Sequence, residues 1–229
     1  MATGAPGTNG VWQYGEDDSE ATFSALLNKA ASTTDTQIGA DRTRLTALEA
    51  RKLSGLVPII PTSVSINAGS SSFNSTTGEI TFTGGTTLTI NGIFSSAYAN
   101  YKIFWEVGSC SNSADVYAQL NNSGGTLGSG YLWSYVSINN SSAVSGTYSA
   151  GQGFWNVGRV QSGNAAYIQM DICNPYTAKT KHFTSLSKDV VISRYNSGDN
   201  GSTTLYPNLL IFPNGQTITN GKCKVYGYN

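Results

Sequence analysis

Residues 101–107 read YKIFWEV, and every second side chain in this stretch is large and apolar. The apolar members are Tyr101, Ile103, Trp105 and Val107, and they alternate with Lys102 and Glu106. Successive side chains of a β-strand point to opposite faces of its sheet. The stretch therefore predicts a strand with one face in a core and the other in solvent.

The same alternation recurs across residues 62–229. The apolar positions are Ile80 and Phe82; Leu88 and Ile90; Val116, Ala118 and Leu120; and Ile168, Met170 and Ile172. Further apolar runs occupy 190–192, 209–212 and 223–226, and Gly/Asn/Ser clusters such as 121–125 and 197–201 separate the runs. Eight or more short, half-buried strands joined by turns predict an antiparallel β-sandwich, jelly-roll-like, over 62–229.

Composition excludes several classes of function. Only 11% of the residues are charged, against an ordinary ~25%, and the formal net charge is zero. A nucleic-acid partner would require a basic stripe, so none is expected. No apolar run reaches the ~18 residues of a membrane span. The first twenty residues lack the basic start and apolar core of a signal peptide.

Charge is concentrated at the N-terminus. Residues 1–57 hold seven acidic and five basic side chains, which is 12 of the 26 charges in the chain. Prolines at 58 and 61 mark the border, since proline cannot continue a helix. We expect an N-terminal lead and a short helix at 1–31, and the polar run 32–35 interrupts the helical pattern after them. A helical stalk over 32–57, a linker at 58–61 and a head at 62–229 follow.

The stalk has a heptad register. Ile38, Leu45 and Lys52 fall at position a and Leu48 at position d, with the polar Asp41 as a defective d position. Arg44 at g and Glu49 at e have the spacing of an interchain ion pair. This pattern predicts a parallel coiled coil, and with it a homotrimer. The alternative is a solitary surface helix that packs on its own domain.

One strand has two apolar faces. Residues 131–138 read YLWSYVSI, with aliphatic side chains at the even positions and Tyr131, Trp133 and Tyr135 at the odd positions. If the aliphatic face joins the core, the three aromatic side chains must contact a neighbouring subunit or a ligand. Both interpretations stay open.

No catalytic, metal or cofactor site is predicted. His182 is the only histidine, and residues 62–229 hold six carboxylates, several at outward positions of alternating strands. The three cysteines, Cys110, Cys173 and Cys223, lack the spacing of metal ligands and are expected to be reduced and buried. We expect a protein that is not an enzyme.

Three segments rich in Gly, Ser and Asn are the expected binding loops: 121–130, 139–153 and 195–204. Two of them hold tyrosines, Tyr148 and Tyr195, which are the candidate binding residues. Aromatic rings stack on sugars and small polar side chains supply neutral hydrogen bonds, so the expected ligand is a host surface glycan. The alternative is that these segments only connect strands.

The sequence also resembles a known family. The stretches GVWQYGEDD (10–18), FSALLN (23–28), RLTALEAR (44–51), YANYKI (98–103) and NGKCKVYGY (220–228) look like minor tail or tail-fibre proteins of bacteriophages that infect actinobacteria. The resemblance implies a trimeric virion protein of the tail, assembled in the host cytoplasm. It implies an N-terminus docked on other virion proteins and a C-terminal head that faces the host.

Two other classes share parts of this pattern. A capsid decoration protein or head fibre would have the same docking segment, stalk and trimeric sandwich. A cell-wall hydrolase module would have the sandwich, but the scarcity of carboxylates and histidine disfavours it.

Overall fold

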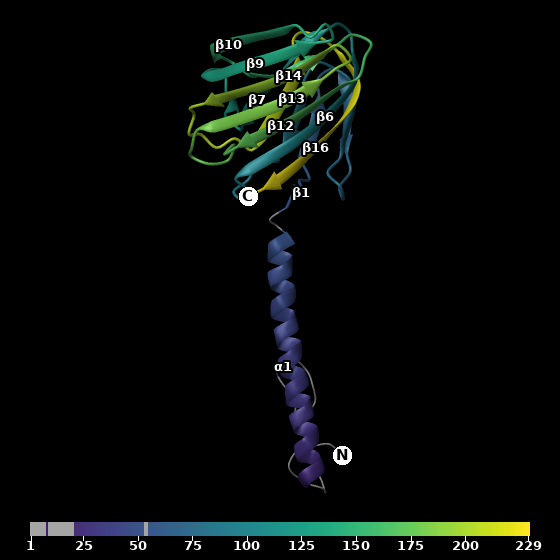
Figure 1. The fold of residues 1–229 in the computed structure, drawn as a ribbon, viewed down its shortest axis with the longest axis vertical. Helices are drawn as coiled ribbons and strands as arrows, with labels where there is room; N and C mark the ends of the chain where they lie inside the picture. Colours follow the sequence, from purple (N-terminus) through teal and green to yellow (C-terminus); the bar gives the residue numbers. More distant parts are fainter. Residues whose placement is uncertain (1–7, 9–20, 53–54) are drawn as a thin grey trace. The chain divides into compact units, whose positions relative to one another are not determined.

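The computed structural model describes residue 8, residues 21–52 and residues 55–229, with helix side chains described for 27–44. The chain divides into two compact units, Met1–Ser54 and Gly55–Asn229. The first contains the helix α1 (Ala21–Lys52), and the second, the head, contains sixteen strands (Figure 1). No helix among the described residues is long and apolar enough to cross a membrane.

Helix α1 runs without a break through 32–35, so the predicted interruption there is wrong. The hydroxyl groups of Thr33, Thr34 and Thr36 donate to the backbone oxygens four residues earlier, at 2.8–2.9 Å. Hydroxyl groups that bond back in this way cost the helix little stability, and the helix continues.

The larger sheet has ten strands and forms the broad face in front in Figure 1. In spatial order, nine of them are β10 (Val144–Gln152), β9 (Tyr131–Asn139), β14 (Ile192–Asn200), β13 (Lys181–Lys188), β12 (Ala166–Cys173), β6 (Asn100–Cys110), β16 (Ile218–Tyr228), β4 (Ile80–Gly84) and β3 (Gly69–Phe73). The tenth, β1 (Val57–Pro58), pairs with β16.

The smaller sheet has six strands. Five of them follow in the order β11 (Trp155–Val160), β7 (Ala114–Asn122), β15 (Asn208–Pro213), β5 (Leu88–Asn91) and β2 (Ser63–Ile66), and β8 (Gly125–Thr126) pairs with β7. The neighbouring strands of both sheets are antiparallel, which confirms the predicted antiparallel sandwich.

The core lies between the two sheets and contains the predicted alternating positions. Tyr101, Ile103, Trp105 and Val107 of β6 are each at most 1% exposed, and the predicted apolar positions of β4, β5, β7 and β12 are buried as well. Two other segments differ from expectation. The predicted linker 58–61 begins inside β1, and the Ile59 N–H donates to the Val225 oxygen at 2.9 Å.

The apolar run 190–192 is mostly a turn rather than a strand. Strand β13 ends at Lys188 and β14 begins only at Ile192. The Asp189 carboxylate accepts the N–H groups of Val191 and Ile192 at 2.7 and 2.6 Å, and Val190 is exposed. An aspartate that bonds the backbone two residues ahead is a turn former, and here it outweighs the β-propensity of the valines.

Candidate functional site

Strand β9 places its aromatic side chains inward, opposite to the arrangement considered from the sequence. Tyr131 is fully buried, and Trp133 and Tyr135 are partly buried. The aliphatic side chains of the other face are 38–52% exposed. The premise of an aliphatic core face therefore does not hold, and the fully buried Tyr131 cannot meet a neighbouring subunit or a ligand. Trp133 lines a groove described below, so for Trp133 and Tyr135 the contact stays a prediction.

The inward arrangement has a physical reason. Aromatic side chains bury more apolar area than aliphatic ones, provided that their polar atoms find partners. The Tyr131 hydroxyl accepts the Leu120 N–H at 2.8 Å, and its ring packs edge-on against Trp155 at 5.1 Å. Burial raises the pKa of Tyr131 above its usual range.

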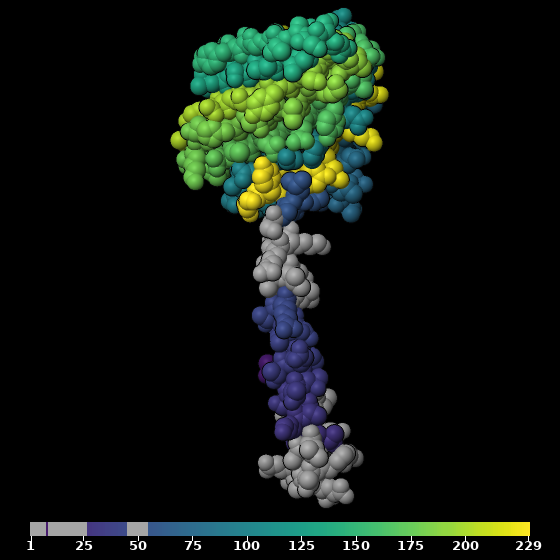
Figure 2. Space-filling model, in the orientation of Figure 1, coloured from purple at the N-terminus to yellow at the C-terminus, as the bar shows by residue number. Residues whose placement is uncertain are grey.

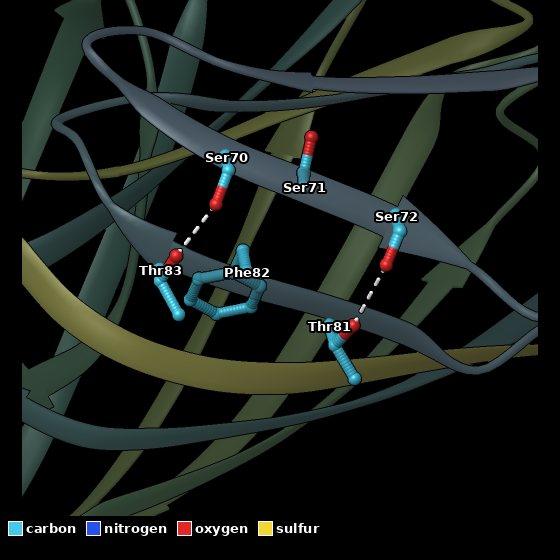
Figure 3. Close-up of a pocket in the computed structure, with 6 residues that line it drawn as sticks. All are labelled: Ser70, Ser71, Ser72, Thr81, Phe82 and Thr83. Atoms are coloured by element: carbon cyan, nitrogen blue, oxygen red, sulfur yellow. Dashed lines mark hydrogen bonds between the residues drawn. The ribbon is translucent and has the colours of Figure 1, made fainter.

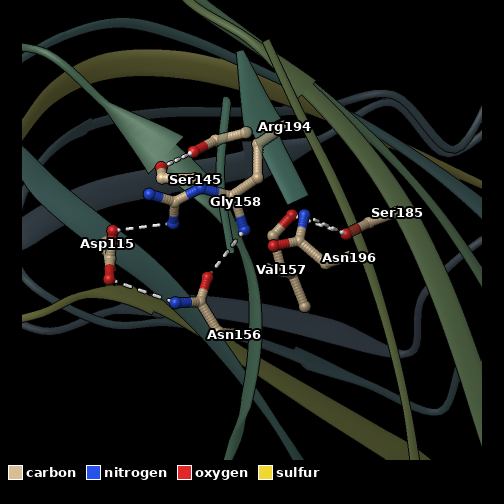
Figure 4. A network of polar contacts seen from close by, with 9 residues as sticks. Asp115, Ser145, Asn156, Val157, Gly158, Ser185, Arg194 and Asn196 are labelled. Carbon is tan, nitrogen blue, oxygen red and sulfur yellow. Dashed lines mark hydrogen bonds and ion pairs between the residues drawn. The ribbon is translucent and has the colours of Figure 1, made fainter. Parts of the chain in front are cut away.

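Arg194 belongs to a polar network between the sheets (Figure 4), and it also contacts Tyr135. The Arg194 guanidinium lies 3.9 Å from the Tyr135 ring centre and donates to Asp115 of β7 at 2.9 Å. Asn156 of β11 donates to the other oxygen of that carboxylate at 3.1 Å. Arg194 is 4% exposed, so we assign this network to joining the two sheets rather than to binding a ligand.

The outer face of the ten-stranded sheet carries the candidate site. Cross-strand partners lie on the same face of a sheet, so the register fixes which side chains are neighbours. One row across β10, β9, β14 and β13 contains Tyr148, Ser134, Ser197 and Thr184. The adjacent row contains Leu132, Asp199 and His182.

These two rows enclose a groove of about 370 Å³, here called the Tyr148 groove. Its outward-facing polar and aromatic members are Ser134, Tyr148, His182, Thr184, Ser197 and Asp199. Tyr148 is 67% exposed, which leaves its ring free to contact a ligand. Figure 2 shows the face over these strands, with β9 and β10 in teal and β13 and β14 in green.

His182 and Asp199 form the one ion pair in the groove, between the His182 Nδ1 and an Asp199 carboxylate oxygen. Both side chains are about half exposed. Cys173 is the cross-strand partner of His182, so Cys173, His182 and Asp199 lie in one row across the neighbouring strands β12, β13 and β14. Burial, and then the charge of Asp171, raise the pKa of the Cys173 thiol, so the thiol stays protonated at neutral pH. A nucleophilic cysteine needs the opposite shift.

The structure separates the two predicted binding tyrosines. Tyr148 lies in β10 and lines the groove, whereas Tyr195 lies in β14, two residues from the groove residue Ser197. The segments 139–153 and 195–204 were expected to be loops, but most of each is strand, so that prediction is wrong. Segment 121–130 keeps its loop character except at β8 and the end of β7.

A second hollow, of about 180 Å³, lies on the β3–β4 hairpin (Figure 3). Its hydroxyl groups bond one another: Ser70 to Thr83 at 2.6 Å, and Ser72 to Thr81 at 3.0 Å. Ser71 is the serine that points away from these pairs. The hollow holds no charge and no exposed aromatic ring, so the Tyr148 groove is the better candidate.

The stalk residues are described only in part. Ile38 is half-buried in α1, and the exposed Arg44 lies 3.6 Å from Asp41 of the same helix. Leu45, Leu48 and Glu49 lie in α1, but their side chains are outside the described part, as is nearly all of residues 1–20. The coiled-coil register therefore stays a prediction.

The cysteines match the expectation from sequence only in part. No cluster of three or more potential metal ligands occurs among the described residues. All three cysteines are free, but Cys173 is only partly buried, whereas Cys110 and Cys223 are buried.

Comparisons with known proteins identify no family. No family model matches the chain, and no curated protein matches it. A solved structure, the C-terminal CBM6 of LamC, a marine laminarinase from Zobellia galactanivorans, aligns with 74% of this chain and 98% of its own. The two share 12% identity and a TM-score of 0.19, which is too low to establish a common fold.

Proposed function

We propose that this chain is a non-enzymatic tail-fibre or minor tail protein of a bacteriophage, whose head binds a host surface glycan in the Tyr148 groove. The observation that carries the proposal is the pairing of an exposed tyrosine with a nearly uncharged, hydroxyl-lined groove of about 370 Å³. That volume is in the range of small-ligand sites.

The side chains of the groove suit a sugar ring. A pyranose stacks its C–H face on an aromatic ring such as Tyr148. The Asp199 carboxylate accepts hydrogen bonds from two adjacent sugar hydroxyls, and charge-assisted bonds of this kind are the stronger ones. Ser134, Thr184 and Ser197 both donate and accept, which matches a ligand made of hydroxyl groups.

Binding without cleavage is proposed from the same side chains. Most glycoside hydrolases use a pair of carboxyl groups that flank the scissile bond. Asp199 is the single carboxylate that lines the groove, and Asp171, in the row of Thr184, already pairs with Lys102 at 3.1 Å. The expected outcome is therefore adsorption of the glycan with no release of soluble sugar.

The proposal extends to the assembly. Helix α1 forms part of a parallel coiled-coil stalk, residues 1–31 anchor the chain on the virion, and a jelly-roll-like head is presented three times. Three weak sites on one particle gain avidity of ~10²–10⁴ when a surface engages them together. A shallow groove with one aromatic ring is then sufficient for attachment.

Adsorption of the purified chain to actinobacterial cells and to their isolated cell-wall polysaccharide tests the binding site. Tyr148→Ala should weaken single-site binding roughly three- to tenfold, the equivalent of one lost aromatic contact. Tyr148→Phe keeps the ring and should bind nearly as well as the wild type, and so should Ser71→Ala in the hairpin hollow. Unchanged binding in Tyr148→Ala and Asp199→Asn would remove the groove as the site.

Placement on the virion is tested separately. Antibodies raised against residues 62–229 should label the tail tip of virions in negative stain. Labelling of the capsid instead would favour a decoration protein or head fibre.

A further inference from the structure

Beside the Tyr148 groove, the outer face of the ten-stranded sheet becomes apolar. The apolar patch is defined by Val136 and Ile138 of β9, Val144 of β10, Leu186 of β13 and Tyr195 of β14. Val136, Tyr195 and Leu186 are consecutive cross-strand partners, and Ile138 pairs with Val144. Each of the five side chains is 50–67% exposed.

The size of the patch points to a macromolecular partner. With Tyr167 and Val190 at its rim, the patch comprises seven side chains, each 47–67% exposed. If a whole aliphatic side chain presents on the order of 100 Å² and a tyrosine ~150–250 Å², together they expose roughly 400–500 Å². The largest apolar patch of an ordinary monomer is ~300–600 Å² and is often functional, and one side of a standard interface buries ~800 Å². The patch alone therefore supplies about half of one side of a standard interface.

The shape and composition of the patch favour a protein surface over a small ligand. The five defining side chains line none of five well-formed hollows on the described residues, whereas a small molecule needs a concave site. A hollow of about 530 Å³ lies at the rim, where Tyr167 and Val190 line it. None of the five carries a charge, so covering them leaves no buried ion without a partner.

The rim of the patch fits a second copy of the same chain. Lys188 and Glu106 are both exposed and flank Tyr167 in one cross-strand row. In a cyclic trimer the interface is heterologous, so a residue of one copy meets a different residue of the next, and a rim with both signs of charge allows opposite charges to pair there. A partner surface with charges of only one sign would place a like charge against either Lys188 or Glu106.

The edge strand β10, which carries Val144 of the patch, has most of its residues exposed, so the sheet is open on that side.

We infer that the apolar patch of the head is an interface with a second copy of this chain, so that the head contributes to self-association together with the stalk. The Tyr148 groove then lies at the border of this interface. This inference extends the self-association proposed above, but it does not depend on glycan binding.

The test measures the mass of the full chain by sedimentation over a range of concentrations. The wild type should sediment as a multiple of 24.1 kDa. Val136→Lys combined with Leu186→Lys should weaken association about tenfold or more, since two charges would be buried without partners. Leu205→Lys, at a position 43% exposed outside the patch, is the matched control and should associate as the wild type does.

A second measurement covers the case in which the stalk alone keeps the copies together. Hydroxyl-radical footprinting of the associated wild type should show Leu186 and Tyr195 protected, while Leu205 and Tyr148 stay reactive. A monomeric wild type, or full reactivity of Leu186 and Tyr195 in the associated wild type, would overturn the inference. If the double variant associates as the wild type does, and Leu186 and Tyr195 are not protected, only the proposal that the stalk holds the copies together remains.

Discussion

Strands β6 and β9 lie in the same sheet and both alternate, yet only one of them has the orientation that its sequence predicts. In β6 the apolar face is buried and the mixed face is turned outward. In β9 both faces are apolar, one aromatic and one aliphatic, and the aromatic face is inside. Alternation therefore identifies a strand, but it orients the strand only when one face is clearly the more polar.

The difference also shows where the molecule has surplus apolar surface. The inner face of β9 is closed by Tyr131 against Trp155 and by the contact of Arg194 with Tyr135. The aliphatic side chains then have no place in the core and remain on the surface. The following predictions test this division, from the largest expected effect to the smallest.

Trp105→Ala in β6 should destabilise the head most. Trp105 is 1% exposed and contacts Phe82, with ring centres 6.3 Å apart, so the substitution leaves a large cavity. Loss of a buried tryptophan costs about 3–5 kcal/mol of unfolding free energy. Urea denaturation measures it, with Glu106→Ala on the outer face as the control, expected within about 0.5 kcal/mol of the wild type.

Cys223 should make the centre of the sheet sensitive to alkali. It is the cross-strand partner of Trp105, and burial raises its pKa from 9.0 to about 12. The unfolded thiol ionises above pH 9 while the folded thiol stays protonated, so stability is lost as the pH rises from 9 to about 12. The loss from this group is about 1.4 kcal/mol per pH unit.

Cys223→Ala should flatten that decline when unfolding free energy is measured from pH 7 to pH 11. At pH 7 the variant should lose only the small packing contribution of the sulfur atom. A decline as steep as that of the wild type would assign the alkaline sensitivity to other groups.

Tyr131→Phe probes the inward face of β9. The substitution keeps the ring against Trp155 but leaves the Leu120 N–H without its acceptor, which costs about 1–3 kcal/mol. Thermal unfolding of this variant beside Tyr148→Phe, an exposed tyrosine of the same sheet, isolates the hydrogen bond. Equal stability of the two variants would mean that the Tyr131 hydroxyl contributes nothing.

The smallest effect is expected on the outward face of β9. Val136→Thr changes a side chain that is 52% exposed and should shift the unfolding free energy by less than about 0.5 kcal/mol. The same exchange at the fully buried Val107 of β6 places a hydroxyl in the core and should cost about 1–3 kcal/mol. Equal losses at both positions would contradict the assignment of faces.

The sequence predicted the sandwich because most strands resemble β6, with one face plainly more apolar. It did not predict the groove, because His182 and Asp199 meet only through the register of β13 with β14. Asp189 marks the turn that sets this register, but the valines after it were interpreted as a strand. The polar residues 144–152 and 195–200 are predicted as loops, since strands rich in Ser, Gly and Asn carry a weak β-signal.

The position of β16 has a consequence for the order of synthesis. This strand is formed by residues 218–228, yet it lies inside the sheet between β6 and β4 and also holds β1 at the start of the head. Until those residues leave the ribosome, β6 and β4 have no common neighbour and their facing edges are open. Pairing between segments so distant in sequence is slow, and open strand edges invite pairing with other chains. Nascent heads are therefore exposed to mispairing until residue 228 has emerged, and polysome crowding or a stall within 218–228 should favour aggregated over native product.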